Sequence, residues 1–377
     1  MTAAVVAVAF LVAFVLSSEG RMAMGAPPSG ERLEQIKNSP QWSGGHFNDV
    51  LPRQASPFVE SMKGFLFGGS NHRVPSQPLP VERRTRADFD APPESGLRIT
   101  WLGHSTLIIE LDGKRILIDP VWGPYAAPFS WMGVGRFYDP PLPFEELPTI
   151  DVVVISHDHY DHLDYPTMLA LAKSDVPFLV PLGVGSHLEH WGIARERITE
   201  LDWWERRSIG DITLVATPAR HFSGRALTDR EETLWAGWAI LGTERRVYYT
   251  GDTAMFPGLT EIGERLGPFD VTLIESGAYS PLWVDVHLGP EQAVQAHQML
   301  RGKLMIPVHW GLFDLAIHGW TEPMERVLAA AQKLGVRVAS PRPGESIEPS
   351  NPPPTGRWWP ALPWDTVDDA PVISTGL

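Results

Sequence analysis

The sequence predicts an α/β protein built of two β-sheets with helices packed on their outer faces. Two observations predict this class. Apolar runs of strand length outnumber helical patterns, yet helical patterns recur between them. Sheets with two apolar faces need a second layer on each side, which one further sheet and outer helices supply. The chain has 377 residues, 43% of them hydrophobic and 20% charged, which is enough to bury such a core.

The strands are predicted from Ile99 onward, where the composition changes. Residues 99–101, 106–111 and 115–118 are apolar runs, and Asp112 and Gly113 between the last two are a strong hairpin signal. Residues 151–155 are apolar without interruption, which is typical of a strand buried on both faces. Further strands are expected at residues 212–217, 238–241, 247–250, 271–275 and 304–308.

Three helices are predicted from the residues at their starts. One begins near Pro166, with Asp164 as its N-cap. The other two cover residues 290–300 and 323–334, and each has proline at its first position, where a missing N–H costs no hydrogen bond.

The chain divides into four parts by composition. Residues 1–26 are expected to be a signal peptide or an N-terminal anchor, because the apolar stretch from Ala3 to Leu16 has the length of a secretory core and is short for a span of about 20 residues. We therefore expect export to the cell envelope or membrane attachment; a misassigned start codon would instead leave the protein cytoplasmic. Residues 27–95 are predicted to be an irregular arm packed on the core, 96–346 the catalytic domain, and 347–377 a Pro-rich tail that is mobile or draped over the surface.

Charge and cysteine content exclude several classes of function. The formal net charge of −14 argues against a nucleic-acid-binding surface, which needs clustered cations. The chain contains no cysteine, so it has no disulfide, no thiolate metal site and no cysteine nucleophile. Any transition metal must be bound by histidines and carboxylates.

The segment that follows the apolar run 151–155 indicates a metal site. His157, His159 and His162, with Asp158 and Asp161, fall within six residues. His157 and His159 are two apart, so an extended chain points both to one side. Asp161 and His162 follow as the chain turns towards the helix, where they could hold a second metal. The alternative is a solvated polar loop. It is disfavoured because so many imidazoles in one short loop would repel one another when protonated and would have no role in packing.

Three later residues stand just beyond apolar runs in the same way. His221 follows the strand 212–217, Asp252 follows 247–250, and His309 follows 304–308. Each alone is weak, because a lone histidine there is as often a surface or hydrogen-bonded residue. Together with the first cluster they predict further ligands at one edge of the fold.

With these ligands the sequence resembles the metallo-β-lactamase superfamily, and within it the branch of N-acylphosphatidylethanolamine-hydrolysing phospholipase D. The resemblance covers about Ser39 to Ser346. Its motifs are much more specific for the fold than for the substrate, and Gln292 departs from the branch by replacing a glutamate. The runs that carry it are Trp101-Leu102-Gly103-His104-Ser105-Thr106, Ile118-Asp119-Pro120, Glu200-Leu201-Asp202-Trp203-Trp204, Gly251-Asp252-Thr253, Gly267-Pro268-Phe269-Asp270, Val286-His287-Leu288-Gly289-Pro290-Glu291 and Val308-His309-Trp310-Gly311.

The resemblance implies the metallo-β-lactamase fold, a four-layer αββα sandwich, with two Zn²⁺ per chain. It implies that one zinc is held by His157, His159 and His221. The second would be held by Asp161, His162 and His309, with Asp252 bridging both. Two cations close together acidify a shared water, and the resulting hydroxide would be the nucleophile.

Further residues are expected around the metals. His287 is a candidate proton donor or substrate-polarising group, and Asp161 is grouped with it as a candidate catalytic residue. Asp119 and His104 are expected to orient metal ligands through hydrogen bonds. Their alternatives are a surface histidine for His287, a turn-forming aspartate for Asp119 and a buried structural histidine for His104. His318 could lie at the rim of the site.

The leading functional hypothesis is a hydrolase that cleaves a phosphodiester of a phospholipid. An ester or lactone hydrolase with the same two metals is the alternative, since the fold does not decide the substrate. A non-catalytic metal-binding envelope protein is a third class. The expected partner is a phospholipid or a small molecule, with peripheral membrane contact and no nucleic acid. No substrate-binding residue is assigned, although Phe58, Phe65, Leu66 and Phe67 of the arm could form one wall of an apolar groove.

Overall fold

A computed structural model describes residues 18–54, 57–128, 134–352 and 355–376. The apolar stretch from Ala3 to Leu16 lies outside these ranges, so export and membrane attachment stay predictions. None of the helices in the described ranges is long and apolar enough to cross a membrane.

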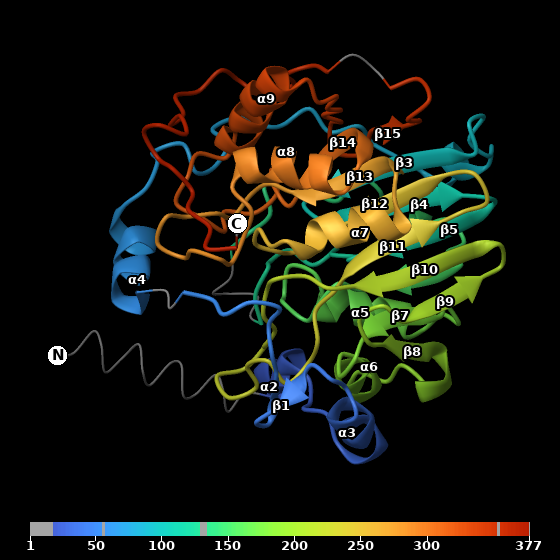
Figure 1. Ribbon diagram of the computed structural model, residues 1–377. Helices are drawn as coiled ribbons and strands as arrows, with labels where there is room; N and C mark the ends of the chain where they lie inside the picture. The colour runs from blue at the N-terminus through green and yellow to red at the C-terminus, as the bar shows by residue number, and fades with distance from the viewer. Residues whose placement is uncertain (1–17, 55–56, 129–133, 353–354, 377) are drawn as a thin grey trace.

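Two sheets form the centre of the molecule (Figure 1). The seven-stranded sheet has the order β15-β3-β4-β5-β6-β7-β8, and the six-stranded sheet has the order β14-β13-β12-β11-β10-β9. The strands of the first sheet are β3 Leu97–Gly103, β4 Thr106–Leu111, β5 Lys114–Ile118, β6 Val152–Val154, β7 Phe178–Pro181, β8 Ile198–Leu201 and β15 Ser346–Ile347. Those of the second are β9 Arg206–Ile209, β10 Ile212–Thr217, β11 Gly237–Leu241, β12 Arg246–Tyr249, β13 Phe269–Glu275 and β14 Gly302–Val308.

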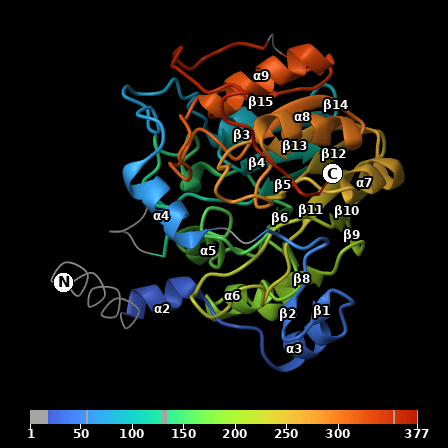
Figure 2. The ribbon, with the colours of Figure 1, turned by 60° about the vertical axis from the view of Figure 1, so that its left-hand side comes forward.

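Helices lie on the outer face of each sheet, as Figures 1 and 2 show. The helices are α2 Ser18–Met24, α3 Gly30–Lys37, α4 Phe58–Phe67, α5 Tyr165–Leu171, α6 Gly185–His190, α7 Gly258–Leu266, α8 Pro290–Met299 and α9 Glu322–Leu334. Helix α8 packs on β13 and β14 of the six-stranded sheet, and α6 packs beside β8. Side chains of β4 alternate between two cores: Leu107 and Ile109 face the other sheet, whereas Ile108 packs with α5 and α6. The layers are therefore those of an αββα sandwich.

The predicted strands and helices are all present within a few residues of their expected bounds. Asp112 and Gly113 both have positive φ and join β4 to β5 with Leu111 opposite Lys114, which confirms the two-residue hairpin. Asp164 accepts a hydrogen bond from Thr167 N and caps α5. The sequence prediction missed β7, β8, β9, α6 and α7, which are short or lie in stretches of mixed composition.

The description of residues 27–95 as irregular was wrong in part. Helices α3 and α4 lie in this arm, and so does a small hairpin of β1 Trp42–Ser43 and β2 His46–Phe47. Ile36 and Phe47 are fully buried in the main core, so apolar residues spaced to fit that core order the arm.

The tail is draped over the molecule, the second of the two arrangements expected for it. Strand β15 pairs with β3, and Trp359 is buried against Trp310. The boundaries of the four parts of the chain stay predictions.

Candidate metal centre

The loop between β6 and α5 brings its histidines to the carboxyl end of the parallel strands. His157 and His162 are buried, and His159 and Asp161 are half-buried. The loop closes on itself because His159 O accepts hydrogen bonds from the backbone N–H groups of His162 and Leu163. The predicted location of this cluster at a strand end is therefore confirmed.

One group of side chains could hold a metal ion on one side of the loop. It consists of His157, His159, His221 and Asp252, whose nitrogen and oxygen atoms all lie within 4.8 Å of one another. His159 Nδ1 is 2.9 Å from His157 Nε2 and 3.3 Å from His221 Nε2. His221 Nδ1 donates to Val286 O at 3.0 Å, which leaves Nε2 free to act as a ligand.

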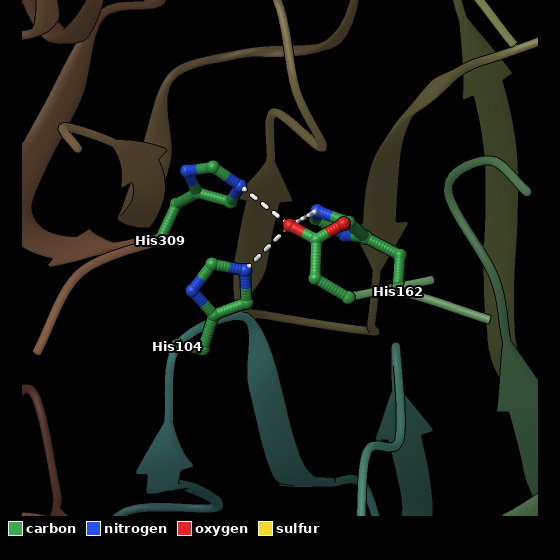
Figure 3. A group of neighbouring side chains, drawn as sticks. His104, His162 and His309 are labelled. Carbon is green, nitrogen blue, oxygen red and sulfur yellow. Dashed lines mark hydrogen bonds and ion pairs between the residues drawn. The ribbon is translucent and has the colours of Figure 1, made fainter. Parts of the chain in front are cut away.

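A second group lies around Asp161. Figure 3 shows His104, His162 and His309 pointing at one carboxylate oxygen. This oxygen, Asp161 Oδ2, is 2.9 Å from His104 Nε2, 3.3 Å from His309 Nε2 and 3.4 Å from His162 Nε2. These four residues could also hold a metal ion. His104, expected only to orient a ligand, therefore has a nitrogen at ligand distance as well.

Asp252 lies between the two groups. Its Oδ1 is 3.2 Å from His162 Nε2, and its Oδ2 is 3.1 Å from His309 Nε2. Oδ2 is also 3.8 Å from His157 Nε2 and 3.7 Å from His221 Nε2. One carboxylate thus contacts both sets of imidazoles, as the expected bridging position requires.

Asp119 lies behind His162 and orients it. Its carboxylate accepts hydrogen bonds from His162 Nδ1 at 2.7 Å, from Ser156 N and Oγ, and from Tyr249 OH at 2.6 Å. All four residues are buried. Since Nδ1 donates to Asp119, Nε2 is the His162 nitrogen that faces the centre. The alternative expected for Asp119, an aspartate that only forms a turn, does not account for these contacts.

His287 is paired with a carboxylate that the sequence prediction passed over. Its Nδ1 donates to Glu275 Oε2 at 2.7 Å, and Glu275 is fully buried at the end of β13. Glu275 also accepts from the backbone N–H groups of Thr253 and Leu288. Its position at the end of a strand, like that of His157 and His309, was the signal that could have identified it.

The donor set fits divalent cations. Among the described residues, the buried atoms His162 Nε2 and Asp252 Oδ1 have no hydrogen-bond partner. An unpartnered buried polar atom is costly, and a cation shared by these groups removes that cost. Imidazole and carboxylate in an open arrangement are ligands that Zn²⁺ accepts.

Comparison with known proteins matches residues 114–310 to the family described as "Beta-lactamase superfamily domain". The chain belongs to the metallo-β-lactamase superfamily. An uncharacterised protein of Mycobacterium tuberculosis is 47% identical over 76% of this chain and 77% of its own length. The N-acyl-phosphatidylethanolamine-hydrolyzing phospholipase D 1 of Caenorhabditis elegans is 37% identical over 68% of this chain and 76% of its own length. A metallo hydrolase from Ignicoccus hospitalis shares the fold, with a TM-score of 0.52 at 23% identity over 67% of this chain and 97% of its own.

The acidic groups in this metallo-β-lactamase centre hold protons on two histidines. Burial opposes a positive charge on His309, but Asp252 and Asp161 raise the pKa of His309 to about 10. Burial likewise opposes the charged form of His162, whose pKa Asp252 and Asp161 hold well above its usual range. Burial and the neighbouring His309 lower the pKa of His104 to about 3. A cation must displace the protons on His162 and His309 to bind their nitrogens.

A cavity of about 1000 Å³ opens over the centre of this superfamily member. His159, Asp161, Asp252, His287 and His309 lie in its wall. The side chains contributed by the arm are Asn48, Asp49, Leu51, Pro52, Arg53, Gln54 and Ser61.

The expected wall of Phe58, Phe65, Leu66 and Phe67 was wrong as far as the structure describes it. Phe67 is 87% exposed, and Phe65 lies under the Arg73 guanidinium, away from the cavity lining. The side chains of Phe58 and Leu66 lie outside the described part. The arm reaches the cavity mainly through the segment 48–54, which follows the hairpin β1–β2 and lines the cavity with both polar and apolar side chains.

The remaining histidines are buried in the fold or lie at the surface, outside the two groups of possible ligands. His187 and His297 are buried, whereas His46, His72 and His190 lie at the surface or are half-buried. His318 lines a small cavity shared with His104 and His309 and stacks on Tyr279. It therefore lies behind the centre.

Proposed function

We propose that this protein is a two-zinc hydrolase that cleaves a phosphodiester of a phospholipid, with N-acylphosphatidylethanolamine as the first substrate to test. One observation carries the proposal: two groups of possible ligands lie beneath a cavity of about 1000 Å³, and the Asp252 carboxylate of one group contacts His162 and His309 of the other. The 37% identity to a protein named as an N-acyl-phosphatidylethanolamine-hydrolyzing phospholipase D supports the substrate.

Seven residues are proposed to hold the two cations. His157, His159 and His221 would bind one, Asp161, His162 and His309 the other, and Asp252 would bind both. When bound, two such cations acidify a shared water and neutralise charge on the phosphoryl oxygens. Asp119 and Val286 O fix the tautomers of His162 and His221, so that their Nε2 atoms are ready to coordinate.

His287 is proposed to deliver a proton to the leaving alkoxide. It lines the cavity, and its Nδ1 is engaged by Glu275, so Nε2 is the nitrogen that remains for substrate. The buried Glu275 side chain holds the orientation of the imidazole, as the acid partner of a catalytic histidine does in other hydrolases.

The size of the cavity is in keeping with a lipid headgroup. About 1000 Å³ is the upper end of the range for small-molecule sites. The net charge of −14 does not prevent phosphate binding, because charges on the surface are screened over roughly 8–10 Å whereas ligated cations act at contact distance. Contact with a membrane surface, from which a phospholipid would be drawn, belongs to the same proposal.

Metal analysis and a substrate panel test the proposal. We expect about two divalent ions per chain. We also expect metal-dependent release of a phosphatidic acid from N-acylphosphatidylethanolamine in detergent micelles, identified by mass spectrometry. Asp252→Asn, which keeps the shape but not the charge, should lose metal and nearly all turnover. If the metal-loaded enzyme leaves the lipids intact and opens lactones instead, the substrate assignment is wrong; full activity without metal would refute the centre itself.

A further inference from the structure

A buried ion pair joins two segments that carry proposed site residues. Arg220 and Asp285 are 0% and 2% exposed, and Arg220 Nη1 donates to Asp285 Oδ1 at 2.8 Å. Arg220 directly precedes His221. Asp285 lies two residues before His287, and the residue between them, Val286, accepts the His221 Nδ1 hydrogen bond.

The backbone of Asp285 needs these contacts. Its φ of +64° is in the left-handed region, which a non-glycine residue rarely occupies. A strained residue of this kind persists only where the surroundings impose its conformation. The orientation of the loop that carries His287 therefore depends on what holds the Asp285 side chain.

The C-terminal segment supplies much of that support. Thr375 N donates to Asp285 Oδ1 at 2.9 Å, and Thr375 Oγ1 donates to Asp285 Oδ2 at 2.5 Å. The same hydroxyl accepts from Arg220 Nη2 at 3.0 Å. A hydroxyl can donate and accept at once, so Thr375 is hydrogen-bonded to both charged partners.

Other contacts fix this segment against the domain. Gln292 Nε2 donates to Val372 O at 3.0 Å, and Arg326 Nη1 donates to Ala370 O at 3.0 Å. At Gly376 the backbone approaches so closely that an added Cβ would lie 2.0 Å from Met255 O. Residues 370–376, here called the C-terminal clasp, are thus packed into place.

The ion pair also holds one wall of the cavity. Arg220 Nη2 donates to Pro52 O at 2.7 Å, and Gln54 N donates to Asp285 Oδ2 at 3.3 Å. Pro52 and Gln54 both line the cavity over the proposed metal centre. The arm, the His221 segment and the His287 loop therefore meet at the Arg220–Asp285 ion pair, and Thr375 is hydrogen-bonded to both of its members.

We infer that the C-terminal clasp is a positioning element for the active site. Thr375 acts through the Arg220–Asp285 pair to hold the His287 loop and the cavity wall in place. The expected effect on turnover rests on the proposed function. Thr375 hydrogen-bonds to Arg220 and Asp285, neither of which lines the cavity or belongs to the seven proposed ligands, so its effect passes through this pair.

Two substitutions of Thr375 test this role in the full chain. Thr375→Val keeps the shape and removes the hydroxyl, whereas Thr375→Ser keeps the hydroxyl. We expect Thr375→Val to speed amide exchange of residues 284–288 by about tenfold, the scale of one hydrogen bond to a charged group, with little change in strands β4 and β5. Metal content should stay that of the wild type. Turnover of a soluble phosphodiester should fall about tenfold in kcat with KM changed less than about twofold. Thr375→Ser should restore both values.

The two readouts separate the clasp from the proposed function. Unchanged exchange at residues 284–288 in Thr375→Val would overturn the inference, and so would faster exchange spread evenly over the whole domain, since that indicates general destabilisation. If kcat per metal-loaded molecule is unchanged, the clasp does not position the active site. If the wild type cleaves no phosphodiester, the proposed function fails, but local exchange still decides whether Thr375 orders the loop.

Discussion

Replacing Asp119 by asparagine should weaken metal binding without disturbing the backbone. Asp119 has a φ of +37°, and asparagine tolerates such angles about as well as aspartate. The two side chains also have nearly the same volume. The change therefore tests what the carboxylate does for His162.

The expected magnitude follows from the hydrogen bonds of Asp119. Its Oδ1 accepts from Ser156 N at 2.7 Å, so an asparagine oxygen should remain there and place its NH₂ where Oδ2 was. Oδ2 accepts from the hydroxyls of Ser156 and Tyr249 and from His162 Nδ1. Hydroxyls can turn and accept from the new NH₂, but an Nδ1–H cannot.

His162 would then have to lose its Nδ1 proton and carry the proton on Nε2, the nitrogen that faces Asp161 and Asp252. A protonated Nε2 cannot bind a cation. Loss of such an orienting partner typically costs 10–100-fold in metal affinity. We therefore expect one of the two sites to weaken by about 10–100-fold, which corresponds to about 1.4–2.8 kcal/mol.

Competition with a chromogenic chelator measures both affinities. Asp112→Asn is the matched control, since Asp112 also has positive φ but lies in the β4–β5 turn and accepts from Thr243. The control should bind metal as the wild type does. Two sites of wild-type affinity in Asp119→Asn would refute the argument that Asp119 sets the tautomer of His162.

Three further predictions follow from particular contacts. His287→Ala should retain both metals and lose about 10²–10⁴-fold in turnover, the usual scale for general acid–base catalysis, and unchanged kinetics would make it a surface histidine. Burial lowers the pKa of His297 to about 4, below the unfolded value near 6.5, so the wild type should lose about 3 kcal/mol of stability as the pH falls from 7 to 4. His297→Asn should lose less over that range, and parallel urea midpoints for the two proteins would contradict this. A chain that starts at Pro27 should be about 2–3 kcal/mol less stable than one that starts at Ser18, because the buried Arg225 donates through Nε and Nη2 to Ala23 O. Equal thermal unfolding of the two chains would show that residues 18–26 contribute nothing.

The metal loop could be predicted from the sequence because its ligands are close together in the chain. His157, His159, Asp161 and His162 follow a short apolar strand, so one local turn is enough to gather them. His221, Asp252 and His309 were found because each follows an apolar run, and strand ends on one edge converge. The structure brings all seven together; their roles as ligands stay predictions.

Glu275 and the cavity wall could not be assigned in this way. Glu275 carries no signal beyond its place at a strand end, and its partner His287 lies on a loop whose path depends on Asp285. The arm was expected to present its apolar residues to the cavity. It presents the mixed segment 48–54 instead, because burial of Ile36 and Phe47 elsewhere decides where the arm lies.

The sequence by itself predicted nine strands of the two sheets, three helices and the residue types of the proposed ligands, since periodicity, capping residues and clustered histidines are local properties. Only the tertiary structure decided which groups orient those ligands and what closes the cavity. Thr375 and Asp285 are 90 positions apart, and Arg220 is 155 positions from Thr375. Contacts over such separations depend on how whole layers pack, so a short sequence pattern does not predict them.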